Sequence, residues 1–436
     1  MSGSERKTVH IPEICRVEGH EAVTVEIAGG KVESVQLEVF EGTRFFEKIV
    51  LGHHFSEMPH ITSRVCAICS TGHVLAAING AERSLKFKPS LTTSLYRELM
   101  HLGMIIESHA THVYALALPD FVGAPDLYKF ATEHADMFAA WTRLRNLGAL
   151  IQTIVGGRPF HPVNLQVGGL SHYPTVDELA PISAGLEEHF QLPVDICTFL
   201  MKIKPAVERT TSPSFLALIP EGKAYGYFGE RVRSSDGFEE SIDNYKEYLA
   251  EHSVPYSHAK RSPGKGKPLM VGSMARLHFY SDRLSDVARG IYARSPLAAG
   301  DTNTIWNNLA QAIEIVEAFE RSKEIIRLLK QDNLVAKGHD STKLSPRAGR
   351  SAGAVECPRG TLYHYYELDE KGVIRAADMI TPSAQNTARI ELDIREVVDQ
   401  ATDPTSPQLQ ANLETLIRAY DPCNTCATHM VSVRYR

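Results

Sequence analysis

The chain has 436 residues, 43% of them hydrophobic and 22% charged, and its formal net charge is −6. This is the composition of a globular protein with one large core or two to three domains. Without a block of Lys or Arg, it offers no electrostatic basis for binding nucleic acid or an anionic membrane surface. No apolar run approaches the about 20 residues that span a bilayer, and the N-terminus lacks a secretion signal, so we expect a cytoplasmic protein.

The first 60 residues are expected to be rich in β structure. Residues 21–40 alternate apolar and polar side chains around Gly29-Gly30, which predicts a β-hairpin. Residues 92–118 carry apolar side chains at helical spacing, and this predicts a long helix that stops at Pro119.

The remainder of the chain is expected to be mainly helical. Helical spacing recurs over 126–154, where Gly156-Gly157 marks the end, and over 303–330 and 386–419. Short strands are expected within 335–382, and 257–268 is a basic loop rich in Gly and Pro. Since no domain boundary is evident, we predict a single domain over 1–436, mainly α with a β-rich N-terminal part (α+β).

Four of the seven cysteines form two Cys-x-x-Cys pairs, each followed by a histidine: Cys66 and Cys69 with His73, and Cys423 and Cys426 with His429. In a reducing compartment such pairs indicate a metal or redox site. Thiolates are soft ligands that favour Zn, Fe, Ni or Cu(I), so a structural zinc site with four cysteines is one interpretation.

Two observations argue against structural zinc. The pairs lie 423 − 66 = 357 positions apart, whereas zinc ribbons usually join pairs about 15–20 residues apart. The second pair is also preceded by Asp421-Pro422, which stiffens the backbone at its entry because proline fixes its own φ and restricts the residue before it.

The sequence resembles the large, catalytic subunit of the [NiFe] hydrogenases. The resemblance rests on RVCAICSTGH and DPCNTCATH around the cysteine pairs, and on further motifs in the expected order: RVEGH (16–20), RFFEKIVLG (44–52), SHATHVYALALPD (108–120), ECPRG (356–360) and TPS (381–383). One mild departure is Ala67, where the family commonly has glycine. The resemblance implies a large-subunit fold around a long-helix bundle, with both termini contributing to a buried metal site.

The resemblance also implies the ligands of a dinuclear centre. Cys66 and Cys423 match the terminal nickel ligands, and Cys69 and Cys426 match the thiolates that bridge nickel to an iron carrying CO and cyanide. A bridging sulfur donates to two metals, which suits a deprotonated thiolate.

Four further positions match residues around that centre. Glu18 matches the glutamate that relays protons, a task suited to a carboxyl whose pKa is tuned by burial. Arg359 matches an arginine above the metals, and Asp120 matches the aspartate that pairs with it. Ser383, after Pro382, matches the hydroxyl that hydrogen-bonds a cyanide.

The resemblance also implies a third metal site, and several histidines need separate interpretation. Glu47 and His429 match ligands of a third metal, Mg²⁺ or iron, near the C-terminus, although Mg²⁺ prefers oxygen ligands. His73 matches a histidine beside a bridging cysteine. His109 and His112 share a helix face but lack the Glu-x-x-His pattern of a di-iron bundle, so we interpret them as packing and hydrogen-bonding groups of the core.

By this resemblance the chain is the catalytic subunit of a soluble [NiFe] hydrogenase that cleaves H2 reversibly into protons and electrons. The segment AYGYFGERVRSSDG (224–237) is most like the cytoplasmic, bidirectional NAD(P)-linked and sulfhydrogenase-type group. The remaining cysteines are scattered and no Gly-x-Gly-x-x-Gly stretch is present. Electrons must therefore leave through an iron–sulfur small subunit, with flavin and iron–sulfur diaphorase subunits behind it leading to a soluble carrier such as NAD(P).

Two alternatives remain at this stage: a non-catalytic homologue, as in complex I, and a scaffold held by zinc. The four retained cysteines argue against the first.

Seven residues, 430–436, follow His429. In most of the family such a tail is removed after nickel insertion, so we expect cleavage after His429.

Overall fold

A three-stranded antiparallel sheet opens the chain in the computed structural model, which describes residues 6–42, 44–206, 211–331, 334, 339–404 and 406–428. The predicted hairpin is confirmed, with Gly29 and Gly30 at φ of 58° and 78°, the left-handed region that its tight turn requires. The strands of this sheet are β1 (Arg6–Ile11), β2 (Glu21–Ala28) and β3 (Lys31–Val39).

Helices begin soon after this sheet. Between Phe46 and Leu85 the chain forms α1 (Phe46–Ile49), η1 (Phe55–Glu57), α2 (Met58–Thr62), η2 (Ser63–Val65) and α3 (Ser70–Leu85). The strands of the β-rich N-terminal part therefore end at Val39.

The helix predicted over 92–118 forms, but it is not stopped by Pro119. It runs as α4 (Leu91–Ala110), continues through a π-helical stretch (Thr111–Ala117) and enters α5 (Leu118–Val122). Pro119 lies in the first turn of α5, where a missing N–H breaks no helical hydrogen bond. The end comes at Gly123, whose φ of 72° is a left-handed cap.

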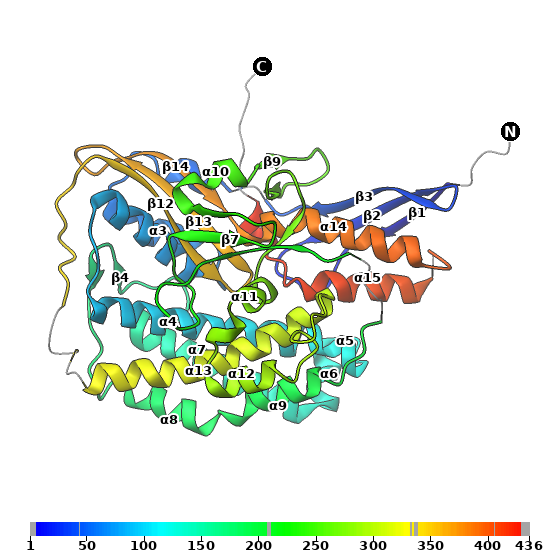
Figure 1. Cartoon of the computed structure of the whole chain (residues 1–436), viewed down its shortest axis with the longest axis horizontal. Coiled ribbons are helices and arrows are strands. Elements are labelled where there is room, and N and C mark those ends of the chain that lie inside the picture. The colour runs from blue at the N-terminus through cyan, green and yellow to red at the C-terminus, as the bar shows by residue number, and fades with distance from the viewer. Residues whose placement is uncertain are drawn as a thin grey trace, which may run out of the picture.

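The helix predicted over 126–154 is divided at His134. It forms α6 (Leu127–Glu133) and α7 (Ala135–Gly156), and Gly157 caps α7 at φ 85°, where the end was predicted. The next two helices are α8 (Ala180–Glu188) and α9 (Gln191–Leu200). The segment 303–330 forms η6 (Thr304–Trp306) and α13 (Asn307–Gln331). α4, α7, α8, α9 and α13 pack together as a helical layer (Figure 1).

The strands expected within 335–382 are confirmed as an antiparallel sheet of β12 (Gly349–Cys357), β13 (Gly360–Leu368) and β14 (Ile374–Ile380). α3 packs very closely against this sheet. A Cβ added to Gly353 on β12 would be only 2.2 Å from the backbone nitrogen of Gly80 on α3, so the contact requires glycine. Cys357 pairs with Gly360, so Pro358 and Arg359 form the two-residue turn of this hairpin.

A third sheet has four short strands in the order β11-β6-β7-β8. Its strands and the other elements of the middle of the chain are β4 (Leu165–Gln166), β5 (Gly169–Leu170), β6 (Ser214–Leu218), β7 (Arg231–Ser234), β8 (Glu239–Ser241), η4 (Ile242–Asn244), α10 (Tyr245–Tyr248), β9 (His252–Ser253), β10 (Lys260–Arg261), β11 (Leu269–Met270), α11 (Ser273–Tyr280), η5 (Ser281–Arg283) and α12 (Asp286–Tyr292).

The basic loop 257–268 is tied into the molecule. Lys260 and Arg261 are buried in ion pairs, Lys260 with Glu251 at 2.8 Å and Arg261 with Glu391.

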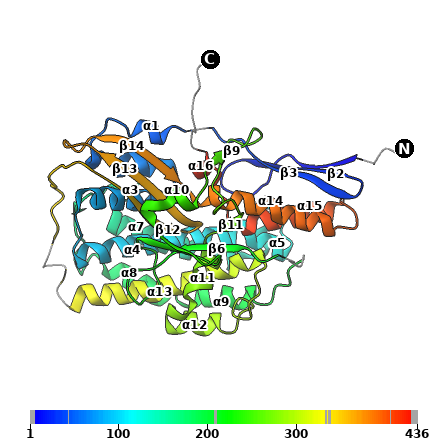
Figure 2. The ribbon, with the colours of Figure 1, turned by 45° about the horizontal axis from the view of Figure 1, so that its top comes forward.

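The C-terminal part forms α14 (Pro382–Gln400), α15 (Pro407–Ala419) and α16 (Asn424–Ala427). α16 lies in the middle of the molecule, between the β1–β3 sheet and the β12–β14 sheet (Figures 1 and 2). A bridge between Glu18 and Cys423 joins it to the loop before β2. In the described part of the chain, no helix combines the length and apolar character needed to cross a bilayer.

Candidate metal centre

The two cysteine pairs meet in one buried cluster. Cys66 and Cys69 lie on the turn between η2 and α3, and Cys423 and Cys426 lie at α16. The Sγ atoms of Cys66 and Cys423 are 3.6 Å apart, those of Cys69 and Cys426 3.1 Å apart, and those of Cys423 and Cys426 2.9 Å apart. All four lie within 4.8 Å of one another, which is the size of a single metal's coordination sphere.

The thiols of this cluster differ in acidity. Hydrogen bonding with Cys423 holds the pKa of Cys66 well below its usual value. Burial opposes ionisation of Cys423, but its hydrogen bond with Cys426 outweighs burial, and the pKa of Cys423 is lowered to about 7. The pKa of Cys69 is raised by its hydrogen bond with Cys423, and that of Cys426 is raised by burial. One thiol of each pair therefore ionises readily, and a bound cation would be needed to hold all four as thiolates.

A small cavity adjoins three of the sulfurs. It is lined by Cys69, Cys423 and Cys426, together with His73, Cys357, Pro358, Arg359, Leu362, Pro382 and Ser383. A structural zinc site needs no space beyond its four ligands. The cavity adjoins every sulfur of the cluster except that of Cys66, so a second metal there could share cysteine sulfurs with the first, and the residues fit a dinuclear centre.

Arg359 reaches this cavity from the tip of the β12–β13 hairpin. Its Nε donates to the backbone oxygen of Asp421 at 2.7 Å, and its Nη2 donates to Asp421 Oδ1 at 2.8 Å. Its Nη1 is buried and has no hydrogen-bond partner among the described residues. Gln311 donates to the other carboxylate oxygen of Asp421 at 3.0 Å. Arg359 is thus fixed on one side and keeps donors for a ligand on the other.

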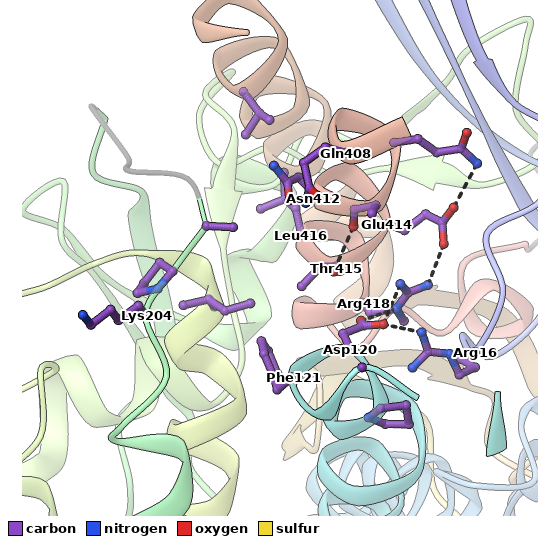
Figure 3. A pocket seen from close by; sticks show the side chains of 18 of the residues that line it. Arg16, Asp120, Phe121, Lys204, Gln408, Asn412, Glu414, Thr415, Leu416 and Arg418 are labelled. Carbon is purple, nitrogen blue, oxygen red and sulfur yellow. Dashed lines mark hydrogen bonds and ion pairs between the residues drawn. The ribbon is translucent and has the colours of Figure 1, made fainter. Parts of the chain in front are cut away.

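The expected pairing of Arg359 with Asp120 is wrong. Both carboxylate oxygens of Asp120 are taken by Arg418, at 2.7 and 3.0 Å, and Arg16 also binds one of them (Figure 3). This ion cluster borders a separate cavity of about 710 Å³ between α5 and α15. Asp421 has the role expected of Asp120 because it directly precedes Pro422-Cys423 and so enters the site with its ligand.

Glu18 lies beside Cys423, the first cysteine of the second pair. Its carboxylate accepts hydrogen bonds from the backbone N–H of Thr425 at 3.1 Å and from the Thr425 hydroxyl. Burial, followed by the charge of the neighbouring Cys423, raises the pKa of Glu18 to about 8. A carboxyl with a pKa in this range can both accept and release a proton near neutral pH.

Ser383 and His73 both contact residues of the second cysteine pair. Ser383 Oγ accepts the backbone N–H of Cys423 at 2.9 Å, which leaves its own hydroxyl proton to donate elsewhere. His73 Nε2 is 3.7 Å from Cys426 Sγ, and its Nδ1 is 3.0 Å from His364 Nε2. His109 and His112 are buried hydrogen-bonding groups of the core, as interpreted from the sequence.

The third metal was expected to bind Glu47 and His429, and the structure describes only Glu47 of the two. Glu47 Oε1 accepts from Lys260 Nζ and from the Met379 backbone N–H, both at 3.0 Å, and burial raises its pKa. His429 lies outside the described residues. The backbone oxygen of Thr428, the last described residue, accepts a hydrogen bond from the N–H of Arg44 at 3.2 Å, which places Thr428 beside the segment that leads into α1.

A buried charge network supports the ECPRG turn from behind. Arg276 binds Glu314 at 2.6 and 2.7 Å and Glu356 at 2.8 Å, and it donates to the backbone oxygens of Cys357 at 3.0 Å and Pro358 at 3.2 Å. Glu314 also accepts from His109 at 2.8 Å. Arg276 and both carboxylates are at most 1% exposed, so this network fixes the backbone that carries Arg359.

Sequence reasoning missed Asp421, Thr425, Gln311, Cys357 and Arg276. Asp421 and Thr425 had a local signal, because both lie within the motif DPCNTCATH around the second cysteine pair. Cys357 lies within a quoted motif, but a single cysteine there gave no indication that it lines the cavity. Gln311 and Arg276 lie in helices without a motif, and only the fold brings them to the site.

A buried four-thiolate cluster with an adjoining cavity and an overhanging arginine defines a metalloprotein of the thiolate-ligated type. The family model described as nickel-dependent hydrogenase matches residues 44–146 and 217–429. Sulfhydrogenase 1 subunit alpha of Pyrococcus furiosus is 34% identical over 97% of this chain and 98% of that protein. Sulfhydrogenase 2 subunit alpha of the same organism is 31% identical over 98% of this chain and 100% of that protein.

The chain belongs to the nickel-dependent hydrogenase family, as its catalytic large subunit. Its fold is that of solved large subunits. An NAD⁺-reducing [NiFe]-hydrogenase in the H2-reduced state has a TM-score of 0.84 over 98% of this chain and all of that chain, at 24% identity. The relatives are subunits of multi-subunit hydrogenases, so the resemblance inferred from the motifs is confirmed.

Proposed function

We propose that this cluster holds a nickel–iron centre, with CO and cyanide on the iron, and that the protein cleaves and forms H2 there. The observation that carries the proposal is the cage of four Sγ atoms within 4.8 Å, with a cavity that adjoins Cys69, Cys423 and Cys426. When bound, the metals supply the Lewis acidity that polarises H2 and the redox capacity that takes up its electrons.

The chain's own residues would move the proton and stabilise charge. Glu18 would take the proton from the Cys423 side of the centre, because its carboxyl is buried beside that thiol. Arg359 would donate its unpartnered Nη1 into the cavity, where a fixed guanidinium stabilises developing negative charge. Asp421 would position Arg359, whereas Asp120 would act on the Arg16–Arg418 cluster instead.

Three positions would hold ligands or a further ion. Ser383, with Pro382 beside it, would donate its hydroxyl proton to a cyanide nitrogen, since its oxygen already accepts from Cys423. Glu47 and His429 would bind Mg²⁺ or iron. The contact between Arg44 and Thr428 supports this by bringing the two segments together. Lys260 would then lie beside the ion and limit the charge gathered by Glu47 and Glu251.

The electrons would leave through partner subunits. Among the described residues, the four site cysteines are the one cluster suited to a metal, so the route onward needs an iron–sulfur small subunit. The structural likeness to an NAD⁺-reducing enzyme supports diaphorase subunits and NAD(P) as the acceptor. All seven cysteines are free thiols, which fits a reducing compartment such as the cytoplasm.

We further propose that residues 1–436 act as one domain, since the largest hydrophobic cluster of the described residues includes side chains from Ile11 to Cys426. The tail 430–436 would be removed after metal insertion. A chain end free to fold inward at His429 could close the site, and a tail could hold that end open. Intact-mass measurement of active enzyme should give a chain ending at His429, and an active chain ending at Arg436 would refute the cleavage.

Metal analysis tests the central proposal. Protein matured in its native host should contain nickel and iron in near-equal amounts and show the infrared bands of CO and cyanide. A Cys426→Ser variant should lose both metals, whereas a Cys197→Ser variant should keep them, because Cys197 is equally buried but lies in α9 away from the site. Zinc alone in the natively matured protein would refute the proposal.

A further inference from the structure

His112 is a buried histidine with a hydrogen-bond acceptor opposite each of its ring nitrogens. It lies in the π-helical stretch Thr111–Ala117 that continues α4, and it is 1% exposed. Its Nε2 is 2.6 Å from the backbone oxygen of Arg418, and its Nδ1 is 2.5 Å from Oε1 of Gln311. A neutral imidazole carries a single N–H, so it could donate to only one of these two oxygens.

The orientation of the Gln311 amide is fixed by Asp421. Gln311 Nε2 donates to Asp421 Oδ2 at 3.0 Å, and Asp421 Oδ1 accepts from Arg359 Nη2 at 2.8 Å. If the amide were turned over, its oxygen would face a carboxylate that is already ion-paired and has no proton to donate. The amide oxygen therefore stays opposite His112, and both ring nitrogens of His112 must carry a proton for the two contacts to be hydrogen bonds.

Two other buried histidines, His101 and His109 on α4, provide a contrast. His101 Nε2 donates to the backbone oxygen of Glu356 at 2.8 Å. His109 Nε2 donates to the carboxylate of Glu314, also at 2.8 Å. Neither ring has a partner at Nδ1 among the described residues, and burial lowers the pKa of both. These two rings fit the neutral form, and of the three His112 alone is placed to hold two protons.

The charged side chains linked to His112 and its neighbours can accommodate a cation. They form three groups: the Arg16–Arg418–Asp120–Glu414 cluster, the Arg359–Asp421 pair and the Arg276–Glu314–Glu356 network. The first two are each neutral overall, since arginines and carboxylates are equal in number. The third has two carboxylates for one guanidinium, and its Glu314 binds His109, one turn before His112. This net charge of −1 offsets part of the cost of a buried cation, and charge-assisted hydrogen bonds are about twice as strong as neutral ones.

We propose that His112 is a buried imidazolium that positions Arg359 through Gln311 and Asp421. Its two ring protons hold the Arg418 carbonyl and the Gln311 amide, the amide holds Asp421, and Asp421 holds the guanidinium above the cavity. The role at the metals rests on the proposed hydrogenase function, whereas the charge of the ring rests on the contacts alone. His112 is thus a positioning residue, and through it the motif SHATHVYALALPD supports the site.

Nitrogen NMR of the metal-free full chain, labelled at histidine, tests the charge of the ring. At about pH 8 an ordinary histidine, with a pKa of about 6.5, is neutral, but one ring should keep a proton on each nitrogen. That signal should be absent from His112→Gln. Gln311→Leu removes the acceptor opposite Nδ1 and should leave one ring proton, whereas Gln311→Glu keeps an acceptor and should retain both. A neutral His112 in the wild type, or an unchanged ring in Gln311→Leu, would overturn the inference and leave the hydrogenase function intact.

The positioning role is tested in the natively matured complex. His112→Gln and Gln311→Leu should each keep nickel and iron, shift the infrared bands of CO and cyanide, and lower kcat about 10–100-fold, the range typical of groups that orient a metal site. Gln311→Glu should be as slow, because a carboxylate cannot donate to Asp421.

The double variant His112→Gln/Gln311→Leu should be no slower than Gln311→Leu, since both changes break the same chain of hydrogen bonds. Loss of nickel in the single variants would assign a structural role, and additive losses in kcat would separate the two residues; either result would overturn the inference. A natively matured wild type without H2 activity would overturn the proposed function and, with it, the positioning role.

Discussion

Replacing Arg276 by lysine should destabilise the protein and displace Arg359. Arg276 makes six hydrogen bonds through its five N–H groups, to Glu314, Glu356, Ser273 and the backbone oxygens of Cys357 and Pro358. A lysine ammonium has three donors, so at least three of these bonds are lost. The acceptors involved are buried, and water cannot replace the missing donors.

The size of the effect follows from those losses. Breaking a buried ion pair costs about 3–5 kcal/mol, and an unfolding entropy of about 2.1 cal/mol/K per residue converts this to about 3–5 °C in Tm. Urea and thermal unfolding of the metal-free chain measure it. Arg289→Lys is the control, since Arg289 and Asp286 form an exposed pair that contributes about 0–1 kcal/mol. Arg276→Lys within about 1 kcal/mol of wild type would refute this account of the network.

Three further predictions concern the site and its surroundings. Cys423→Ser should abolish nickel binding while Cys357→Ser keeps it, as metal analysis of both variants will show; equal nickel loss would make Cys357 a ligand. Gly72→Ala should cost about 1–3 kcal/mol in urea unfolding, because the new Cβ would lie 2.2 Å from Cys357 Sγ; adding Cys357→Ala should recover most of it, and no recovery would contradict the clash. Because the pKa of Glu21 is raised to about 7 in the fold, its ionisation weakens the fold as pH rises from about 4.5 to 7. Glu21→Gln should therefore stabilise the metal-free chain relative to wild type by an amount that grows over that range, on the order of 3 kcal/mol, and a difference independent of pH would contradict it.

Local sequence patterns were sufficient for much of the fold. The Gly29-Gly30 hairpin and the cap at Gly157 depend on nearby residues, and both formed where expected. Pro119 failed as a helix stop because a π-helical stretch before it moved the proline into a first turn. Such a stretch depends on tertiary packing, which a helical pattern does not contain.

The candidate site was likewise predictable only where it depends on local sequence. The cysteine spacing was enough to indicate a shared metal site, because two adjacent turns supply the ligands. The partner of Arg359 was assigned to Asp120 rather than Asp421, since the choice depends on how α5 and the 421–428 segment approach the β12–β13 turn. Arg276 and Glu21 were missed because charged residues are seldom buried, so nothing in their local sequence marks them.

The position of α16 in the middle of the molecule has a consequence for biosynthesis. The ligand pairs are 357 residues apart, and at about 5–20 residues per second the first pair emerges about 20–70 s before the second. During that interval Cys66 and Cys69 are half a site, and two soft thiolates bind zinc readily. Correct metal loading therefore depends on delivery to a completed chain rather than on the order in which free ions meet the nascent protein.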